Sequence, residues 1–279
     1  MDLLIPILSL AALGMLFGIG LAVASKKLAV QIDPRLEKIN SLLPGSNCGA
    51  CGGAGCFGFA EMLLSGKSGP DACKVSEDNI KEQIARLLGQ DLQKKVKTIA
   101  CLHCHGGTRV KDRFIYQGIE DCVAANLILG GQKECVSGCL GFGSCVRVCP
   151  FDAIKMLDDG LPVVIEAKCK ACNKCVLACP KKLFSLVPVT SKVYVACSSH
   201  DAGRDTKAVC PVGCIVCGLC TKACKFNAIH VTDPSTSLRV NPEQGRGVDN
   251  LAVIDYQKCT FCGDCVKVCP TKCILQRAL

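Results

Sequence analysis

The spacing of the cysteines constrains this chain more than any other feature. Three runs, which begin at Cys169, Cys214 and Cys259, share the spacing C-x2-C-x2-C-x3-C. This spacing is typical of ferredoxins with two [4Fe–4S] clusters, in which the fourth cysteine of each run binds the other cluster. A further run begins at Cys139 and matches the pattern, except that Phe142 stands where the second cysteine is expected. The chain from about residue 96 onward is therefore predicted to form two tandem two-cluster ferredoxin-like units.

The number of cysteines agrees with iron–sulfur binding rather than with a disulfide scaffold. The chain has 279 residues and 26 cysteines, whereas disulfide scaffolds of such density are short secreted chains. Cysteines grouped at two- and three-residue intervals are typical of metal ligands, and free thiols need a reducing compartment. The formal charge is +9 with thiols counted as neutral, and each cluster with four thiolates adds about −2. Six clusters reverse the sign of the net charge, so no nucleic acid partner is expected.

The run that lacks a cysteine is predicted to take its missing ligand from upstream. When the run that begins at Cys214 is laid over the run that begins at Cys139, Cys210 matches Cys135, because each lies four residues ahead of its run. We therefore predict that Cys135 replaces the cysteine that is missing at position 142. The alternative is a three-iron cluster on the cysteines that remain, which are Cys139, Cys145 and Cys179.

Exchange of the fourth cysteine within each unit predicts four ligand sets. In the first unit they are Cys135, Cys139, Cys145 and Cys179, and Cys149, Cys169, Cys172 and Cys175. In the second unit they are Cys214, Cys217, Cys220 and Cys269, and Cys224, Cys259, Cys262 and Cys265. Between the runs that begin at Cys139 and Cys169, two β-type segments flank Asp158-Asp159-Gly160, which is typical of a hairpin.

A fifth ligand set is predicted nearer the N-terminus. Four cysteines occupy or follow the glycine-rich stretch GSNCGACGGAGC: Cys48, Cys51, Cys56 and Cys73. The glycines permit positive φ and a close approach of the backbone to a cluster. Helices are predicted over residues 57–65 and from an N-cap at Ser76 to Gly89. A zinc site is the alternative, although zinc motifs usually pair two C-x2-C knuckles.

Six cysteines remain outside these five sets: Cys101, Cys104, Cys122, Cys197, Cys210 and Cys273. The segments KTIAC101 and VYVAC197 are predicted to be equivalent. We expect a sixth cluster that joins the two units and is bound by Cys101, Cys122, Cys197 and Cys210. Cys104 is an alternative to Cys101 in this set. The alternative is free buried thiols, which behave as small apolar residues, and Cys273 is predicted to be one.

The stretch Cys101-Leu-His-Cys104-His105 also matches C-x-x-C-H, the motif for attachment of c-type haem. Haem attachment is not expected here, because no methionine lies nearby to serve as a second axial ligand and because the predicted topology places this stretch in the cytoplasm.

One segment is predicted to anchor the chain in a membrane. Residues 3–24 are apolar and uncharged, and such a helix covers the hydrocarbon core of about 30 Å. Lys26 and Lys27 follow directly, so the positive-inside rule places the N-terminus outside and the remainder in the cytoplasm. A cleaved signal peptide is the alternative, but the chain begins Met-Asp rather than with a basic region.

These patterns together predict an α+β chain in four parts. They are a transmembrane anchor (residues 1–25), a small helical iron–sulfur domain (26–95), a first ferredoxin-like unit (96–192) and a second (193–279). Five [4Fe–4S] clusters are expected, and a sixth where the two units meet.

In this order, the anchor, the CGACGG-type cluster domain and the polyferredoxin part resemble the B subunit of the Rnf complex, the ion-translocating ferredoxin:NAD oxidoreductase. The resemblance covers the whole chain and includes GSNCGACGGAGC, GIEDC and GCLGFGSCVRVCPFDAI. It implies a single-pass protein in the cell membrane that accepts electrons from soluble ferredoxin. It also implies membrane and flavin-bearing partner subunits that complete NAD reduction and the transport of Na+ or H+.

No substrate-converting site is expected in the chain itself, because it contains neither a G-x-G-x-x-G fingerprint nor a P-loop. One-electron transfer by bound cofactors is the predicted chemistry. Two alternatives remain open. The chain could deliver electrons or methyl groups to a corrinoid enzyme, or serve as a polyferredoxin component of another membrane oxidoreductase.

Overall fold

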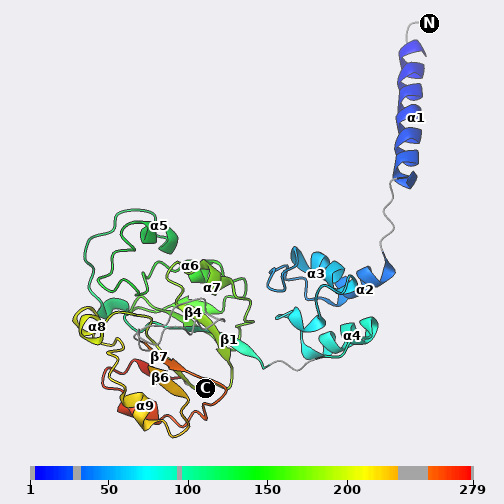
Figure 1. Cartoon of the computed structure of the whole chain (residues 1–279). Helices are drawn as coiled ribbons and strands as arrows, with labels where there is room; N and C mark the ends of the chain where they lie inside the picture. Colours follow the sequence, from blue (N-terminus) through cyan, green and yellow to red (C-terminus); the bar gives the residue numbers. More distant parts are fainter. Residues whose placement is uncertain (1–3, 28–32, 93–95, 232–250, 278–279) are drawn as a thin grey trace.

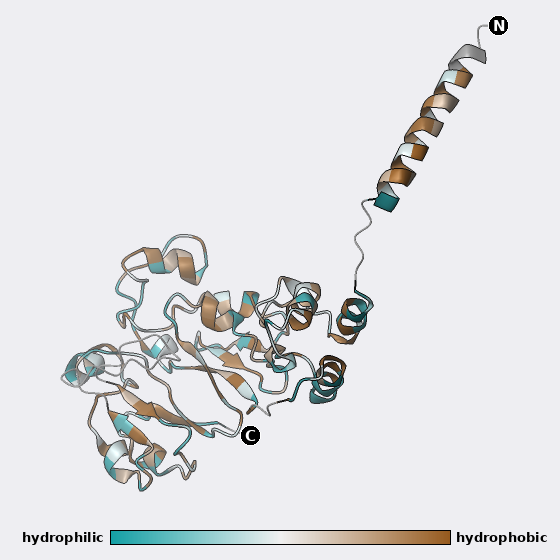
Figure 2. Cartoon of the chain, turned by 45° about the vertical axis from the view of Figure 1, so that its right-hand side comes forward, coloured by the Kyte–Doolittle hydropathy of each residue, from teal (hydrophilic) through white to brown (hydrophobic). Residues whose placement is uncertain are grey.

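A long N-terminal helix stands apart from the rest of the chain. The computed structural model describes residues 4–27, 33–92, 96–231 and 251–277 (Figure 1). Helix α1 (Leu4–Lys27) ends in Lys26 and Lys27. Its stretch Ile7–Lys27 is apolar, and no part of it is buried inside the protein (Figure 2). At 1.5 Å per residue this stretch spans about 30 Å, which matches the hydrocarbon core of a bilayer.

A small helical part follows. Its elements are α2 (Pro34–Leu42), α3 (Gly55–Leu64), the 3-10 turn η1 (Pro70–Ala72) and α4 (Asp78–Leu88). Leu36 and Ile39 of α2 are buried together with Phe59 and Leu63 of α3 and Ile84 of α4. This interior is small, and three cysteines of this part pack within or against it.

The helices predicted for this part are present, with shifted ends. Helix α3 begins two residues before the predicted start and ends one residue earlier. The N-cap of α4 is Glu77 and not Ser76, because the Ser76 hydroxyl donates to Cys73 Sγ at 3.1 Å. Gly89 ends α4 in the left-handed conformation, with φ 65°, as the sequence predicts.

In the described residues from 96 onward, the structure contains four two-stranded antiparallel sheets, two in each half. In the first half (residues 96–192), β1 (Thr98–Leu102) pairs with β4 (Phe184–Pro188), and β2 (Ile154–Met156) pairs with β3 (Pro162–Val164). In the second half (residues 193–277), β5 (Val193–Val195) pairs with β8 (Ile274–Gln276), and β6 (Ile229–Val231) pairs with β7 (Ala252–Ile254). The predicted hairpin is present as β2 and β3.

Short helices place the cysteines between these strands. One helix carries the third cysteine of each run: α6 (Ser144–Arg147), α7 (Lys174–Ala178), α9 (Leu219–Ala223) and α10 (Asp264–Val268). Three more elements precede a run: η2 (Gly107–Arg109), α5 (Cys122–Leu127) and α8 (Gly203–Val209). The predicted α+β class, with a helical N-terminal part and a mixed remainder, is confirmed.

Hydrogen bonds show which residues of the two halves are equivalent. The His103 N–H donates to the Leu183 carbonyl, and the Ala196 N–H donates to the Cys273 carbonyl, both at 2.7 Å. Leu183 and Cys273 each lie four residues after the last cysteine of a run, so His103 corresponds to Ala196. Cys104, and not Cys101, is therefore the counterpart of Cys197, and the predicted match of KTIAC101 with VYVAC197 is shifted by three residues.

Each half has its own apolar core, and the two halves touch. Tyr256 packs against the cores of both halves. Arg277, which follows β8, forms an ion pair with Glu166 of the first half at 3.3 Å. The His103 ring is within hydrogen-bond distance of the Val195 carbonyl (2.7 Å) and of Ser185 Oγ (2.6 Å). The predicted limits of the parts stay predictions, and the limit at residue 95 lies outside the described residues.

Candidate iron–sulfur sites

The first candidate site is built on the loop before α3. It consists of Cys48, Cys51, Cys56 and Cys73, which we call the N-terminal group. Burial raises the pKa of Cys51, and the neighbouring thiols of Cys73 and Cys48 raise it further. The Asn47 side-chain oxygen accepts a hydrogen bond from the Cys56 N–H at 2.8 Å. A Cβ atom at Gly53 would lie 2.7 Å from the Phe59 nitrogen, so this loop needs a glycine where it passes α3.

The four ferredoxin-type runs share one backbone conformation. In each run the second and the fourth residue after the first cysteine have positive φ. In the complete runs these residues are Ala171 and Asn173, Val216 and Gly218, and Phe261 and Gly263. In the run that lacks a cysteine they are Gly141 (φ 84°) and Gly143 (φ 67°). Such turns direct successive N–H groups into a concavity that suits anions, as at many Fe–S sites. The run with Phe142 therefore has the backbone of a cluster site.

The residues after the last cysteine of each run are also alike. The third residue after that cysteine has positive φ in all four runs: Asp152, Lys182, Asn227 and Lys272. This turn points the next N–H at the cysteine sulfur. Ala153 donates to Cys149 Sγ at 3.4 Å, and Ala228 donates to Cys224 Sγ at 3.3 Å. Hydrogen bonds of this kind favour the thiolate form that binds iron.

The structure brings three predicted ligand sets of the runs together. We name them the Cys169 group (Cys149, Cys169, Cys172 and Cys175), the Cys217 group (Cys214, Cys217, Cys220 and Cys269) and the Cys262 group (Cys224, Cys259, Cys262 and Cys265). The Cys262 group lines a single pocket. In the other two groups the thiols perturb one another: after burial, the main causes that raise the pKa of Cys175 to about 12 are the thiols of Cys169 and Cys172.

At the run with Phe142, a cysteine of α5 stands in for the missing second cysteine. One pocket is lined by four cysteines, which we call the Cys122 group: Cys122, Cys139, Cys145 and Cys179. Burial raises the pKa of Cys145 to about 12, with the Cys122 and Cys179 thiols as the next causes. Cys135, the predicted replacement, lies elsewhere. The prediction was wrong because α5 begins at Cys122 and places this thiol beside the run, where Phe142 offers none.

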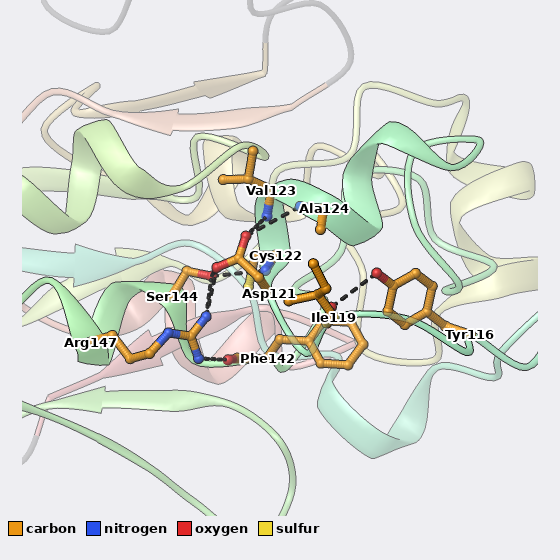
Figure 3. Close-up of polar contacts among 9 residues, drawn as sticks. All are labelled: Tyr116, Ile119, Asp121, Cys122, Val123, Ala124, Phe142, Ser144 and Arg147. Atoms are coloured by element: carbon orange, nitrogen blue, oxygen red, sulfur yellow. Dashed lines mark hydrogen bonds and ion pairs between the residues drawn. The ribbon is translucent and has the colours of Figure 1, made fainter.

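A network of polar side chains surrounds Cys122 (Figure 3). Asp121 is the N-cap of α5 and accepts hydrogen bonds from two N–H groups of the first turn. The same carboxylate accepts from Ser144 Oγ at 2.8 Å and from Arg147 Nη2 at 2.6 Å. These partners lower the pKa of Asp121 to about 2, with the Ser144 hydrogen bond as the largest cause. Asp121 is therefore ionised at neutral pH.

A further group lies between the two halves. One pocket is lined by Cys139 and by four cysteines that lie outside the runs. These four are Cys104 and Cys135 of the first half and Cys197 and Cys210 of the second, and we call them the bridging group. Burial raises the pKa of Cys135 to about 12, followed by the thiols of Cys210, Cys104 and Cys197. A Cβ atom at Gly106 would lie 3.8 Å from both Cys104 Sγ and Cys210 Sγ.

The bridging group is nearly symmetric between the halves. The Cys139 N–H donates to Cys104 Sγ at 3.4 Å, and the Cys214 N–H donates to Cys197 Sγ at 3.3 Å. Cys139 and Cys214 are equivalent, since each is the first cysteine of its run. Of the four cysteines predicted for a sixth cluster, the structure brings Cys197 and Cys210 together. It places the other two, Cys101 and Cys122, at different sites.

Two cysteines belong to none of the six groups. Cys101 lies within β1 and is 4% exposed, and burial raises its pKa to about 12. Because Cys101 is on the strand and Cys104 is in the bridging group, the C-x-x-C-H stretch does not present a pair of thiols to one haem. Cys273 is buried, and its sulfur lies 3.6 Å from Cys269 Sγ.

The donor chemistry of the six groups fits [4Fe–4S] clusters. Each group offers four thiols, which is the usual ligand set of such a cluster. The pockets of the Cys122 and Cys262 groups are lined by neither carboxylates nor imidazoles. Burial raises the pKa of the Cys135, Cys145 and Cys175 thiols, so iron binding at these residues has to displace protons. Among the residues that the structure describes, no three His, Cys, Asp or Glu side chains are grouped to bind a single metal ion.

Two family models match parts of the chain. The model described as "Putative Fe-S cluster" matches residues 43–75, which contain the N-terminal group. The model described as "4Fe-4S dicluster domain" matches residues 213–273, which contain the Cys217 and Cys262 groups. Both matches fall where the geometry places cysteine groups.

Three similar proteins match nearly the whole chain. The B subunit of the Na(+)-translocating ferredoxin:NAD(+) oxidoreductase complex of Acetobacterium woodii is 41% identical, over 98% of this chain and 77% of the relative. The B subunit of the ion-translocating oxidoreductase complex of Methanosarcina acetivorans is 40% identical over 95% of each chain. The B subunit of the proton-translocating ferredoxin:NAD(+) oxidoreductase complex of Clostridium ljungdahlii is 39% identical, over 94% of this chain and 88% of the relative. The chain belongs to the family of Rnf B subunits.

Family membership agrees with the fold. An Rnf B subunit is one member of a multi-subunit complex, and the apolar helix α1 associates this one with a membrane. The first half is matched by neither family model, and it is the half in which Cys122 departs from the regular spacing. The geometry of its sites therefore comes from the structure alone.

The sequence contained a signal for the bridging group that the prediction did not use. The run that begins at Cys214 has all four cysteines and still has Cys210 four residues ahead of it. Cys210 therefore does not replace a missing ligand of its run. Cys135 is the equivalent residue, so it is expected to have the same role as Cys210. Cys122 had a weaker signal, since Asp121 just before it is a favourable N-cap residue.

Proposed function

We propose that this protein relays single electrons from reduced ferredoxin towards membrane partners that reduce NAD+ and transport Na+ or H+. The names of its relatives include both ferredoxin:NAD(+) oxidoreductase and ion translocation. Bound [4Fe–4S] clusters would supply the one-electron chemistry. The chain itself holds the thiolates, surrounds them with apolar side chains and sets the distances between the groups.

Six ligand sets are part of this proposal. Four are unchanged from the sequence: the N-terminal, Cys169, Cys217 and Cys262 groups. The other two replace predicted sets and are the Cys122 group and the bridging group. The two pockets that contain these cysteines support this assignment.

The observation that carries the proposal is an unbroken series of groups. In the middle of the series, the bridging group is joined to the group on either side by an N–H···S hydrogen bond: Cys139 to Cys104 and Cys214 to Cys197. One chain segment thus connects neighbouring groups directly, without an intervening side chain.

The outer links of the series rest on neighbouring thiols. The Cys145 thiol contributes to the raised pKa of Cys175, and the Cys220 thiol contributes to that of Cys265. The Cys48 thiol contributes in the same way to Cys172. The order supported is N-terminal, Cys169, Cys122, bridging, Cys217 and Cys262 group.

The two ends of the series suit different partners. The Cys217 and Cys262 thiols are exposed, and the Lys258, Lys267 and Lys272 side chains near them are exposed as well. We propose that an acidic soluble ferredoxin docks at this end. At the other end, the N-terminal group is nearest in sequence to α1. We propose that it faces flavin-bearing membrane subunits, with the N-terminus outside and residues 26–279 in the cytoplasm.

The test breaks the series in the middle. In the purified complex, the double variant Cys104→Ser, Cys210→Ser should lose about four irons per chain, because one cluster loses two ligands. Reduced ferredoxin should still reduce the Cys217 and Cys262 sites, as seen by EPR, while NAD+ reduction is lost. The control is Cys101→Ala, which removes a buried thiol outside every group. Undiminished NAD+ reduction in the double variant would refute the relay.

A further inference from the structure

Cys122 is delivered to its group by a long excursion of the chain. Residues 111–134 leave the first half and return to it before the first run. Their base is closed by an isolated bridge between Asp112 and Lys133, by an ion pair between the same two residues at 3.0 Å, and by the hydrogen bond from the Arg113 N–H to the Gln132 carbonyl at 2.8 Å. Cys122 is therefore not positioned by spacing within a run, and other contacts have to fix its thiol.

Contacts at the start of α5 tie the excursion to the run. Asp121 Oδ1 accepts from the N–H groups of Val123 at 2.7 Å and Ala124 at 3.2 Å, which fixes the first turn of the helix. Asp121 Oδ2 accepts from Ser144 Oγ and Arg147 Nη2, both on α6 (Figure 3). One carboxylate thus joins the first turn of α5 to the helix that carries Cys145.

Ser144 and Arg147 complete the connection. The Cys122 N–H itself donates to Ser144 Oγ at 2.8 Å, and Ser144 directly precedes Cys145. Arg147 Nη1 donates to the Phe142 carbonyl at 2.8 Å. The Phe142 ring in turn packs on Tyr116 of the excursion, with centroids 5.3 Å apart. The network therefore spans the ligand, its neighbour and the place where a cysteine is missing.

The other runs of this chain provide an internal comparison. The positions that match Ser144 and Arg147 hold Lys174 and Leu177, Leu219 and Lys222, and Asp264 and Lys267. All three of those runs have their second cysteine in place. The serine–arginine pair thus occurs in the one run of the four that lacks its second cysteine.

We propose that Asp121, Ser144 and Arg147 are positioning residues that hold Cys122 as the fourth ligand of the cluster at the Cys122 group. This inference rests on the proposed function, which assigns Cys122 to that group. The role is geometric rather than stabilising. The Arg147 and Asp121 side chains are 52% and 30% exposed, and pairs exposed to this degree contribute little to folding stability.

The test compares four variants of the full-length chain, prepared anaerobically with its clusters. Cys122→Ser removes the ligand and serves as the reference. Asp121→Ser keeps an N-cap hydroxyl for α5 but lacks the carboxylate that meets Arg147. Arg147→Gln changes an exposed residue outside the helix cap. The matched control is Asp112→Ala, which breaks the other ion pair of the excursion and contacts no cysteine.

The readouts are the iron content and the EPR spectrum of the oxidised protein. Cys122→Ser should lose about one iron per chain and gain a three-iron signal, since three thiolates remain. Asp121→Ser and Arg147→Gln should show the same signal in a substantial fraction of molecules, and the control should show none. On titration with iron, these two variants should also need more iron than the control to recover the four-iron form.

The outcomes separate the two proposals. If Cys122→Ser changes neither iron content nor spectrum, the assignment of Cys122 under the proposed function fails. If Cys122→Ser gives the three-iron signal but Asp121→Ser and Arg147→Gln keep the intact spectrum, the positioning role alone is overturned. If Asp121→Ser does not accumulate as folded protein, the exposed Arg147→Gln variant decides by the same criterion.

Discussion

At the residue scale, the cluster sites impose a backbone that several side chains disfavour. Val216 and Phe261 have φ of 57° and 59°, which is unusual for a β-branched or bulky residue. Such strain costs about 1–3 kcal/mol per residue and persists only where the surroundings require it. The same conformation recurs in all four runs, so the strain belongs to the site rather than to one loop.

Two glycines distinguish backbone strain from steric exclusion: Gly203 lies ahead of the run that begins at Cys214, and Gly218 lies within that run. A Cβ atom at Gly203 would lie 2.0 Å from the Ile215 carbonyl oxygen, whereas one at Gly218 would meet nothing within 4 Å. Gly203→Ala should therefore displace Ile215, next to Cys214, and cost about 3 kcal/mol or more. Gly218→Ala has only its positive φ to accommodate, at about 1 kcal/mol. Thermal unfolding of the cluster-loaded protein measures both, and equal losses would contradict this account.

Individual ligands were predictable where spacing alone fixes them. Cys169, Cys172 and Cys175 follow one another at three-residue intervals, so their convergence follows from the run itself. The role of Cys122 was not predictable, because its position depends on the hydrogen bond between Asp121 and Ser144, which are 23 residues apart in sequence. A contact of this kind leaves no periodic trace in the sequence.

At the element scale, each half is closed by a sheet made from its own two ends. Strands β1 and β4 close the first half, and β5 and β8 close the second. Strands of three to five residues bury little surface, so side chains at their ends matter for stability. Arg277, just after β8, is 12% exposed at its side chain and reaches Glu166 and several carbonyls of the first half.

Removal of Arg277 should therefore loosen the contact between the halves. Arg277→Ala leaves the half-buried Glu166 carboxylate without its ion pair and the Pro188 and Val189 carbonyls without this donor, at a cost of about 1–3 kcal/mol. The control is Arg204→Ala, whose side chain is 94% exposed in a pair with Asp205 and is expected to contribute almost nothing. Chemical denaturation of both variants tests the difference, and similar unfolding midpoints would contradict a stabilising role of Arg277.

Elements were predictable where a local signal exists. The hairpin around Asp159 follows from its turn residues, and the end of α4 follows from Gly89. The start of α4 was predicted one residue early, because the Ser76 hydroxyl binds a cysteine sulfur instead of the helix end. The predicted equivalence of β1 with β5 was wrong by three residues, since strands this short have no alternation long enough to fix their alignment.

At the scale of the whole molecule, charge at the exposed end of the series should control the encounter with ferredoxin. Lys258 and Lys267 have side chains 65% and 77% exposed, and Lys272 is exposed as well. Rim charges act mainly on association rates. The triple change to Glu should slow reduction by ferredoxin several-fold at low salt, and added salt should remove the difference.

Stopped-flow reduction at two salt concentrations measures this effect. The matched control is a charge reversal at Lys38 and Lys67 in the N-terminal part, far along the sequence from the Cys262 group. Equal slowing by both sets of changes would place the docking surface elsewhere.

The bridging group also bears on how the protein is made. Two of its thiols come from residues 104 and 135, and the other two from residues 197 and 210. A ribosome therefore has to pass residue 210 before this site exists at all, however early the first half folds. Parts of both halves therefore have to be synthesised before a cluster can be assembled at the bridging group.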